Sequence, residues 1–134
     1  MKRRESALDS DDLHEQEPVV TLEREWMRGA APLAVLTLLA RREMYGYELV
    51  EALERDTGGH LALGQSTVYP LLYNLEGKGH VASQTREAPN GRRRKYYRAT
   101  PDGLAWLESQ RSQWATLVAA MTSLGLADDR TSSG

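Results

Sequence analysis

The densest cluster of chemically active side chains is a basic run near residue 90. Between Arg86 and Arg98 the chain carries six arginines and lysines against one acid, Glu87, and two tyrosines interrupt the run. Such groups bind phosphates with an affinity that falls as salt rises. A charge run can equally be a solvated surface, so composition alone leaves both interpretations open. The six basic residues are Arg86, Arg92, Arg93, Arg94, Lys95 and Arg98.

The position of this run favours contact with a partner over plain solvation. Asn90-Gly91 separates two strand-like segments, residues 80–86 and 92–100, and this dipeptide is typical of β-hairpin turns. Side chains at a hairpin tip can reach a phosphate backbone or lie along a minor groove of DNA. The hairpin residues that we assign to DNA binding are Gly91, Arg92, Arg93, Arg94, Lys95 and Tyr96.

The segment before the hairpin predicts a helix with an unusual outer side. Taking Thr67 as its N-cap makes Pro70 the third helical residue, where a missing N–H is tolerated. Apolar residues between 68 and 75 recur at helical spacing and form a core stripe. Hydroxyls, aromatic rings and an amide occupy the other side, and such groups can read base edges in a major groove. These residues are Ser66, Thr67, Tyr69, Pro70, Tyr73, Asn74 and Lys78.

Three further helices are expected to support these two elements. Residues 29–42 are apolar nearly all round, with Pro32 in the first turn, and predict the buried centre of the domain. Residues 45–56 predict an amphipathic helix that ends before two glycines. Thr100-Pro101 begins a long last helix. The predicted fold class is mainly α with a small antiparallel β-ribbon, a winged helix-turn-helix plus a long C-terminal dimerisation helix.

The last helix carries apolar residues at alternating spacings of three and four, the a/d seam of a coiled coil. We predict a homodimer, because such a seam is too apolar to leave in water. Arg111 interrupts the seam, and we expect it to pair with an acid or border a wet cavity. Trp26 and Trp106 are expected to pack at the dimer interface. The residues assigned to dimerisation are Leu104, Leu107, Trp114, Leu117, Val118 and Met121.

The length of 134 residues leaves room for one modest core. We expect residues 1–22 to be a mobile acidic N-terminal extension and residues 23–100 to be the winged helix-turn-helix DNA-binding domain. Residues 101–126 are then the dimerisation helix, and residues 127–134 a disordered tail.

Composition excludes several classes of function. The net charge of −2 argues against a general polyanion binder, so DNA contact must come from local basic clusters. The chain has no cysteine, and its three histidines lack metal-ligand spacing, so we expect surface histidines and no metal. Without a phosphate loop or nucleophile elbow we expect no enzyme and no cofactor. Without an apolar span or a signal segment we expect no membrane partner and a cytoplasmic protein.

Taken together, the motifs resemble the PadR-type transcriptional regulators over residues 26–122, in the branch with a short C-terminal helix. Two departures are Ser66, where a glycine is common in the family, and the acidic N-terminal extension. The motifs are Arg28-Gly29, Tyr45-Gly46-Tyr47-Glu48-Leu49, Ser66-Thr67-Val68-Tyr69-Pro70-Leu71-Leu72, Leu75-Glu76-Gly77-Lys78-Gly79, Gly91-Arg92-Arg93-Arg94-Lys95-Tyr96-Tyr97 and Thr100-Pro101-Asp102-Gly103.

The resemblance implies a dimeric winged-helix repressor of double-stranded DNA, often released from its operator by a small ligand. Two recognition helices in successive major grooves require a pseudo-palindromic operator. By the same likeness Thr67, Tyr69 and Pro70 lie at the DNA surface. Gly91, Arg92 and Arg93 lie in the tip of the wing.

Trp114 has two interpretations that stay open. In some drug-responsive relatives a tryptophan at this position lines a hydrophobic space between subunits and stacks on flat aromatic ligands. A packing aromatic in the seam is the plainer alternative. On the ligand hypothesis a small aromatic effector contacts Trp114, Arg111 and Val118. A protein-interaction module without specific DNA binding, and a DNA-binding protein without a ligand, are the competing functions.

Overall fold

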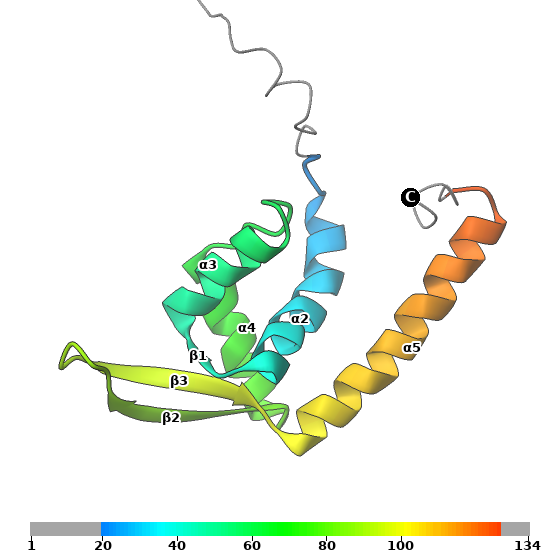
Figure 1. Cartoon of the computed structure of the whole chain (residues 1–134). Helices are drawn as coiled ribbons and strands as arrows, with labels where there is room; N and C mark the ends of the chain where they lie inside the picture. Colours follow the sequence, from blue (N-terminus) through cyan, green and yellow to red (C-terminus); the bar gives the residue numbers. More distant parts are fainter. Residues whose placement is uncertain (1–19, 127–134) are drawn as a thin grey trace, which may run out of the picture.

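The computed structural model describes residues 20–126, so the expectations for residues 1–19 and 127–134 lie outside it. Figure 1 shows three helices on one side of a sheet, and a long last helix that leaves from the end of β3. The predicted fold class, a winged helix-turn-helix with a long C-terminal helix, is confirmed. The elements are α2 (Arg24–Arg41), β1 (Met44–Tyr45), α3 (Gly46–Asp56), α4 (Gln65–Gly77), β2 (Val81–Glu87), β3 (Arg93–Ala99) and α5 (Pro101–Ser123).

The core lies where α2, α3 and α4 meet above the sheet. Leu36 of α2, Leu49 of α3 and Leu72 of α4 have no exposed surface. Val81 and Tyr97 close the core from the sheet, and α5 contributes one buried leucine at its start. Each of these helices therefore has one buried side, which leaves the opposite side available for contacts.

Helix α2 begins five residues before the expected start at residue 29. Pro32 is consequently its ninth residue and not part of its first turn. Proline is costly in a helix interior because it cannot bond the carbonyl four residues back. Here that carbonyl belongs to exposed Arg28, where water can reach it, and the added turns pack Met27 against the core.

Helix α4 also begins earlier than expected. Its N-cap is Gly64 and not Thr67, whose N–H already bonds the Gly64 carbonyl at 3.0 Å. Pro70 is the sixth residue of the helix, and it is exposed on the outer side. The end of the helix at Gly77 agrees with the expected end at residues 77–79.

The expected hairpin forms, and a third strand that the sequence did not predict joins it. Strands β2 and β3 pair antiparallel from Val81 with Ala99 to Glu87 with Arg93. Strand β1 is two residues long and pairs with the free edge of β3, which gives the order β1-β3-β2. A strand this short has no detectable alternation, and only its partner defines it.

The start of α5 is fixed against the loop between α4 and β2. Thr100 is the N-cap as predicted, and its hydroxyl accepts a bond from the Gly103 amide at 3.0 Å. A Cβ at position 103 would overlap the backbone carbonyl of His80. His80 stacks on Trp106 with the ring centroids 5.1 Å apart. The expectation of an ordinary surface histidine was therefore wrong for His80, whose Nδ1 is buried. The expectation that Trp106 packs at the dimer interface stays a prediction.

Candidate nucleic-acid interface

The outer side of α4 carries every helix residue that the sequence assigned to DNA contact. Val68, Leu72 and Leu75 point into the core, and this fixes which side of the helix faces outward. The aromatic Tyr73 is 81 % exposed, which is unusual for its type unless it meets a partner. We call this surface the outer face of α4. It consists of Ser66, Thr67, Tyr69, Pro70, Tyr73, Asn74 and Lys78, all of which are exposed.

One residue of the outer face of α4 is positioned by a glycine in α3. A Cβ at Gly46 would overlap the ring and hydroxyl of Tyr69. Gly46 is buried, while Tyr69 keeps 40 % of its surface exposed. The ring of Tyr69 therefore lies against the start of α3 and presents one side outward. The motif Tyr45-Gly46-Tyr47 marked this position in the sequence, but not the contact.

The hairpin tip, residues 88–93, is a closed turn held by its own backbone. The Ala88 amide bonds the Arg92 carbonyl at 2.7 Å, and the Asn90 side chain accepts a bond from the Arg92 amide at 3.1 Å. Gly91 has a φ of 88°, which favours glycine. Arg92 and Arg93 are exposed, and neither forms an ion pair within residues 20–126. Their charges are available for a partner.

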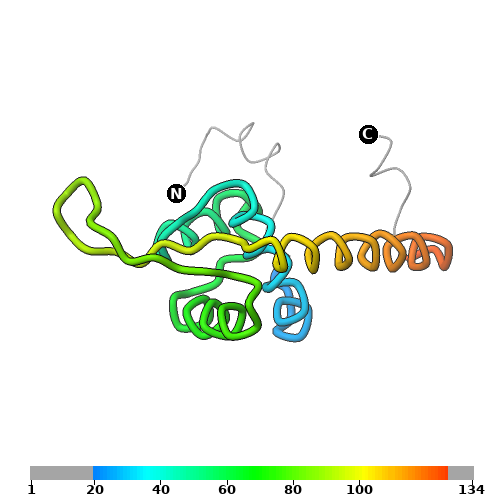
Figure 2. The backbone as a smooth tube through the Cα atoms, turned by 90° about the horizontal axis from the view of Figure 1, so that it is seen from below, coloured from blue at the N-terminus to red at the C-terminus, as the bar shows by residue number. Residues whose placement is uncertain are grey.

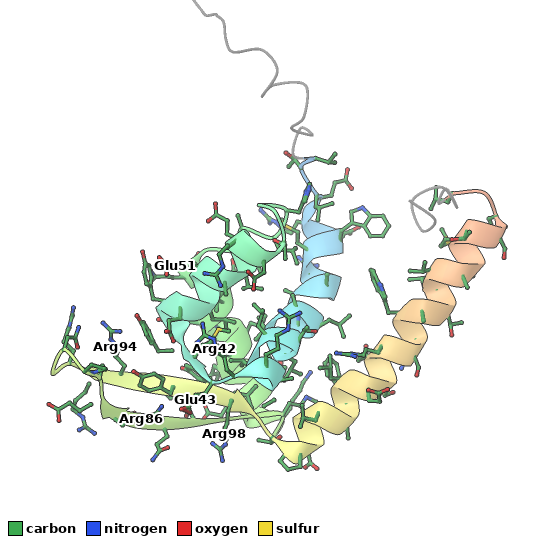
Figure 3. All side chains as sticks on the ribbon, in the orientation of Figure 1. Arg42, Glu43, Glu51, Arg86, Arg94 and Arg98 are labelled. Atoms are coloured by element: carbon green, nitrogen blue, oxygen red, sulfur yellow. The ribbon has the colours of Figure 1, made fainter. Side chains whose placement is uncertain are left out.

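The strand part of the hairpin differs at Arg86, which lies in β2 opposite Arg94 and is already engaged within the chain. Both terminal nitrogens of Arg86 donate hydrogen bonds to the Glu43 carboxylate, Nη1 to Oε2 at 3.3 Å and Nη2 to Oε1. The Arg86 guanidinium also lies 3.9 Å from the centroid of the Tyr96 ring. The hydrogen bond from Arg86 lowers the pKa of Glu43, and the same bond raises the pKa of Arg86. Glu43 and Arg86 lie along the sheet in Figure 3.

The other wing residues named from the sequence also make contacts inside the chain. Arg94 lies 4.2 Å over the ring of Tyr45, which meets Tyr96 edge-on with the centroids 5.7 Å apart. Lys95 is 3.8 Å from the carboxylate of Glu76 in α4. Arg94, Lys95 and Tyr96 therefore connect the hairpin to β1 and α4, a role that their charge and type alone could not show.

The residues assigned to a ligand and to dimerisation lie on α5. Trp114 is 55 % exposed and borders two hollows between α2 and α5, of about 280 and 620 Å³. Arg111 lines the smaller hollow, and Trp26 lines the larger one. Val118 lines neither hollow, although it is exposed. Trp114 is thus not a buried packing residue of a single chain.

The seam on α5 divides into two parts. Leu107 is buried in the core of its own chain, which leaves it little surface for a partner. Leu104, Leu117 and Val118 are each more than 40 % exposed, and Met121 is half-buried. The apolar surface of α5 therefore lies mainly beyond its first two turns.

A family model for PadR-like transcriptional regulators matches residues 35–109, more than half of the chain. The chain belongs to the PadR-like family. This family contains transcriptional regulators, so the protein is a DNA-binding regulator and not an enzyme. Within residues 20–126, no helix is long and apolar enough to cross a membrane, and no three acidic or histidine side chains converge on a metal site.

Similar proteins support this membership. A transcriptional regulator of Mycobacterium tuberculosis is 40 % identical over 88 residues, which cover 66 % of this chain and 78 % of that protein. The solved structure of a PadR-family regulator from Eggerthella lenta is 36 % identical, with a TM-score of 0.67 over 78 % of this chain and 88 % of that one. A transcriptional regulator from Clostridium thermocellum is 25 % identical, with a TM-score of 0.70 over 77 % and 97 % of the two chains.

Proposed function

We propose that this PadR-like regulator is a dimeric repressor that binds a pseudo-palindromic DNA operator in the cytoplasm. The observation that carries the proposal is the outer face of α4, a polar and aromatic helix surface in the same domain as a hairpin whose tip carries two arginines that form no ion pair within residues 20–126. A helix of this kind fits the major groove, while an adjacent basic hairpin fits the phosphate backbone or the minor groove. The two α4 helices of a dimer would then occupy successive major grooves.

We assign separate roles to the two elements. Thr67, Tyr69 and Asn74 contribute hydroxyl and amide groups that can bond base edges, which carry sequence information. Arg92 and Arg93 contribute charge that neutralises phosphates and positions the protein. In this assignment residues 23–100 form the DNA-binding domain and residues 101–126 the dimerisation helix.

The two hollows beside Trp114 are the proposed site of regulation. Their walls are mostly apolar, and the exposed indoles of Trp26 and Trp114 border the larger one. Flat aromatic molecules stack on exposed indoles. We propose that a small aromatic or hydrophobic effector binds there, with Arg111 at the rim of the site. Quenching of intrinsic fluorescence by the effector that is smaller in Trp114→Phe than in the wild type tests this point.

The test of the function is an electrophoretic shift with the promoter region of the gene itself and with scrambled DNA, at two salt concentrations. We expect a promoter-specific shift that survives at the higher salt. Asn74→Ala should reduce binding to the promoter only, by about 1–3 kcal/mol, while Arg93→Ala should reduce binding to both DNAs alike. Equal binding to both DNAs that disappears with salt would favour a protein-interaction module.

A further inference from the structure

The first half of α2 has two different sides. Glu25, Trp26 and Gly29 face α5 and line the larger hollow beside Trp114. Arg24 and Arg28, one turn apart, lie on the other side and line a separate hollow. The function proposed above uses only the side of α2 that faces α5.

This second hollow is shared with α4. It has a volume of about 500 Å³, and its other wall includes Gly64, the N-cap of α4, and Thr67 from the outer face of α4. Figure 2 shows α4 and the start of α2 at the same side of the body, with α3 on the opposite side. The hollow is therefore continuous with the surface that we assign to DNA. It lies at the beginning of α4, whereas the hairpin follows the end of α4.

The two arginines differ in their surroundings from the other helix arginines. Arg41 and Arg55 both lie within 4.0 Å of the Asp56 carboxylate, and Arg42 lies 3.9 Å from Glu48. Within residues 20–126 neither Arg24 nor Arg28 forms an ion pair, and both are exposed. The hollow thus carries two positive charges that the described chain does not neutralise.

We propose that Arg24 and Arg28 form a second phosphate-binding site, which contacts the DNA backbone beside the first turn of α4. The proposal rests on the DNA-binding function. A helix in a major groove has one phosphate strand on each side. The hairpin, which follows the C-terminal end of α4, supplies cations at its extended tip (Figure 2), and the arginine pair supplies them beside the first turn of α4. DNA is then contacted through its backbone at both ends of the recognition helix.

The test compares the salt dependence of DNA binding by fluorescence anisotropy. We expect Arg24→Gln/Arg28→Gln to lower the slope of log affinity against log salt by about 0.9 for each lost phosphate contact. Affinity at moderate salt should fall about tenfold, for the operator and scrambled DNA alike. Each single variant should show about half of this change in slope. Arg24→Lys/Arg28→Lys should retain most of the slope, because it keeps both charges.

The matched control is Arg41→Gln/Arg55→Gln, which removes two arginine charges that Asp56 already partners. This variant should keep the wild-type slope. A wild-type slope in Arg24→Gln/Arg28→Gln, with the operator still bound, would overturn the inference but not the proposed function. A shift toward monomer with an unchanged slope would also overturn it, since the pair would then serve a protein contact. Failure of the wild type to bind DNA would overturn both.

Discussion

Two arms extend from opposite ends of the body, the β2–β3 hairpin and α5 (Figure 2). The hairpin is basic and is connected to the body by contacts within one chain, from Arg86 to Glu43 and from Arg94 to Tyr45. Within residues 20–126, helix α5 packs on the body near its base, through Leu107 and Trp106, whereas residues 111–120 are all exposed. A single chain therefore completes the hairpin, whereas it leaves the apolar surface of α5 exposed, and the proposed dimer would cover that surface.

The largest expected effect comes from placing charge on the free part of α5. Leu117→Glu/Val118→Glu should convert the dimer to a monomer, because two carboxylates cannot be buried without partners. Operator affinity should fall by about 100-fold or more, because the second half-site no longer binds as part of the same molecule. Analytical ultracentrifugation and anisotropy measure the two changes.

The control for this prediction is Ser112→Glu/Thr116→Glu, which adds the same charge to the opposite side of α5. This variant should remain dimeric and bind the operator as the wild type does. If both variants behave alike, the apolar seam is not the dimer contact.

The next effect concerns the contact between Gly103 of α5 and His80, the residue that precedes β2, where both α5 and the hairpin begin. Gly103→Ala should lower the free energy of unfolding by about 1–3 kcal/mol, because the new Cβ overlaps the His80 carbonyl. Gly77→Ala has no such neighbour and should raise stability by about 0.5–1 kcal/mol. Chemical denaturation of both variants measures the difference. Equal effects would mean that the contact between Gly103 and His80 does not constrain the base of α5.

A smaller effect separates the arginines of the hairpin tip from Arg86, which is already paired in strand β2. Arg93→Gln should lower the salt slope of DNA binding by about 0.9, as expected for one lost phosphate contact. Arg86→Gln should leave the slope unchanged and weaken binding only slightly, because Glu43 already neutralises Arg86. Anisotropy titrations at several salt concentrations give both slopes. Equal losses of slope would contradict the distinction between the exposed arginine Arg93 and the paired arginine Arg86.

The smallest effect is the pH dependence of the pair between Glu43 and Arg86. The pKa of Glu43 is lowered in the folded state, so the pair stabilises the fold above the ordinary carboxyl pKa and loses this effect as pH falls through the lowered value. Exposed ion pairs contribute little. The wild type should melt slightly above Glu43→Gln at neutral pH, and the two melting temperatures should converge in acid. A difference that is constant with pH would exclude the pair as its cause.

Local patterns predicted the elements of this fold well, because each has a local signal. Asn90-Gly91 defined the hairpin, and Thr100-Pro101 defined the start of α5. The spacing of the apolar residues of α4 correctly predicted which side faces outward. The predicted starts of α2 and α4 were wrong, because the prediction placed Pro32 and Pro70 in the first turns of these helices. Both lie inside helices, where the exposed surface around them makes the lost backbone bond less costly.

The contacts of the candidate site were harder to predict, since they join residues far apart in the chain. Strand β1 exists only through its pairing with β3, and Glu43 meets Arg86 across 43 positions. The sequence does not distinguish a basic residue whose charge is neutralised within the chain from one whose charge is exposed. The sequence therefore indicated a basic hairpin, but not that Arg92 and Arg93 differ from Arg86 and Lys95.

The most direct test of the central claim is methylation interference on the operator bound to the wild-type protein. Two α4 helices of one dimer should make guanine N7 methylation inhibitory in two major-groove segments on one side of the duplex, about 10 base pairs apart or a multiple of that spacing. Interference in a single segment, or at none, would contradict a dimer that reads DNA through α4.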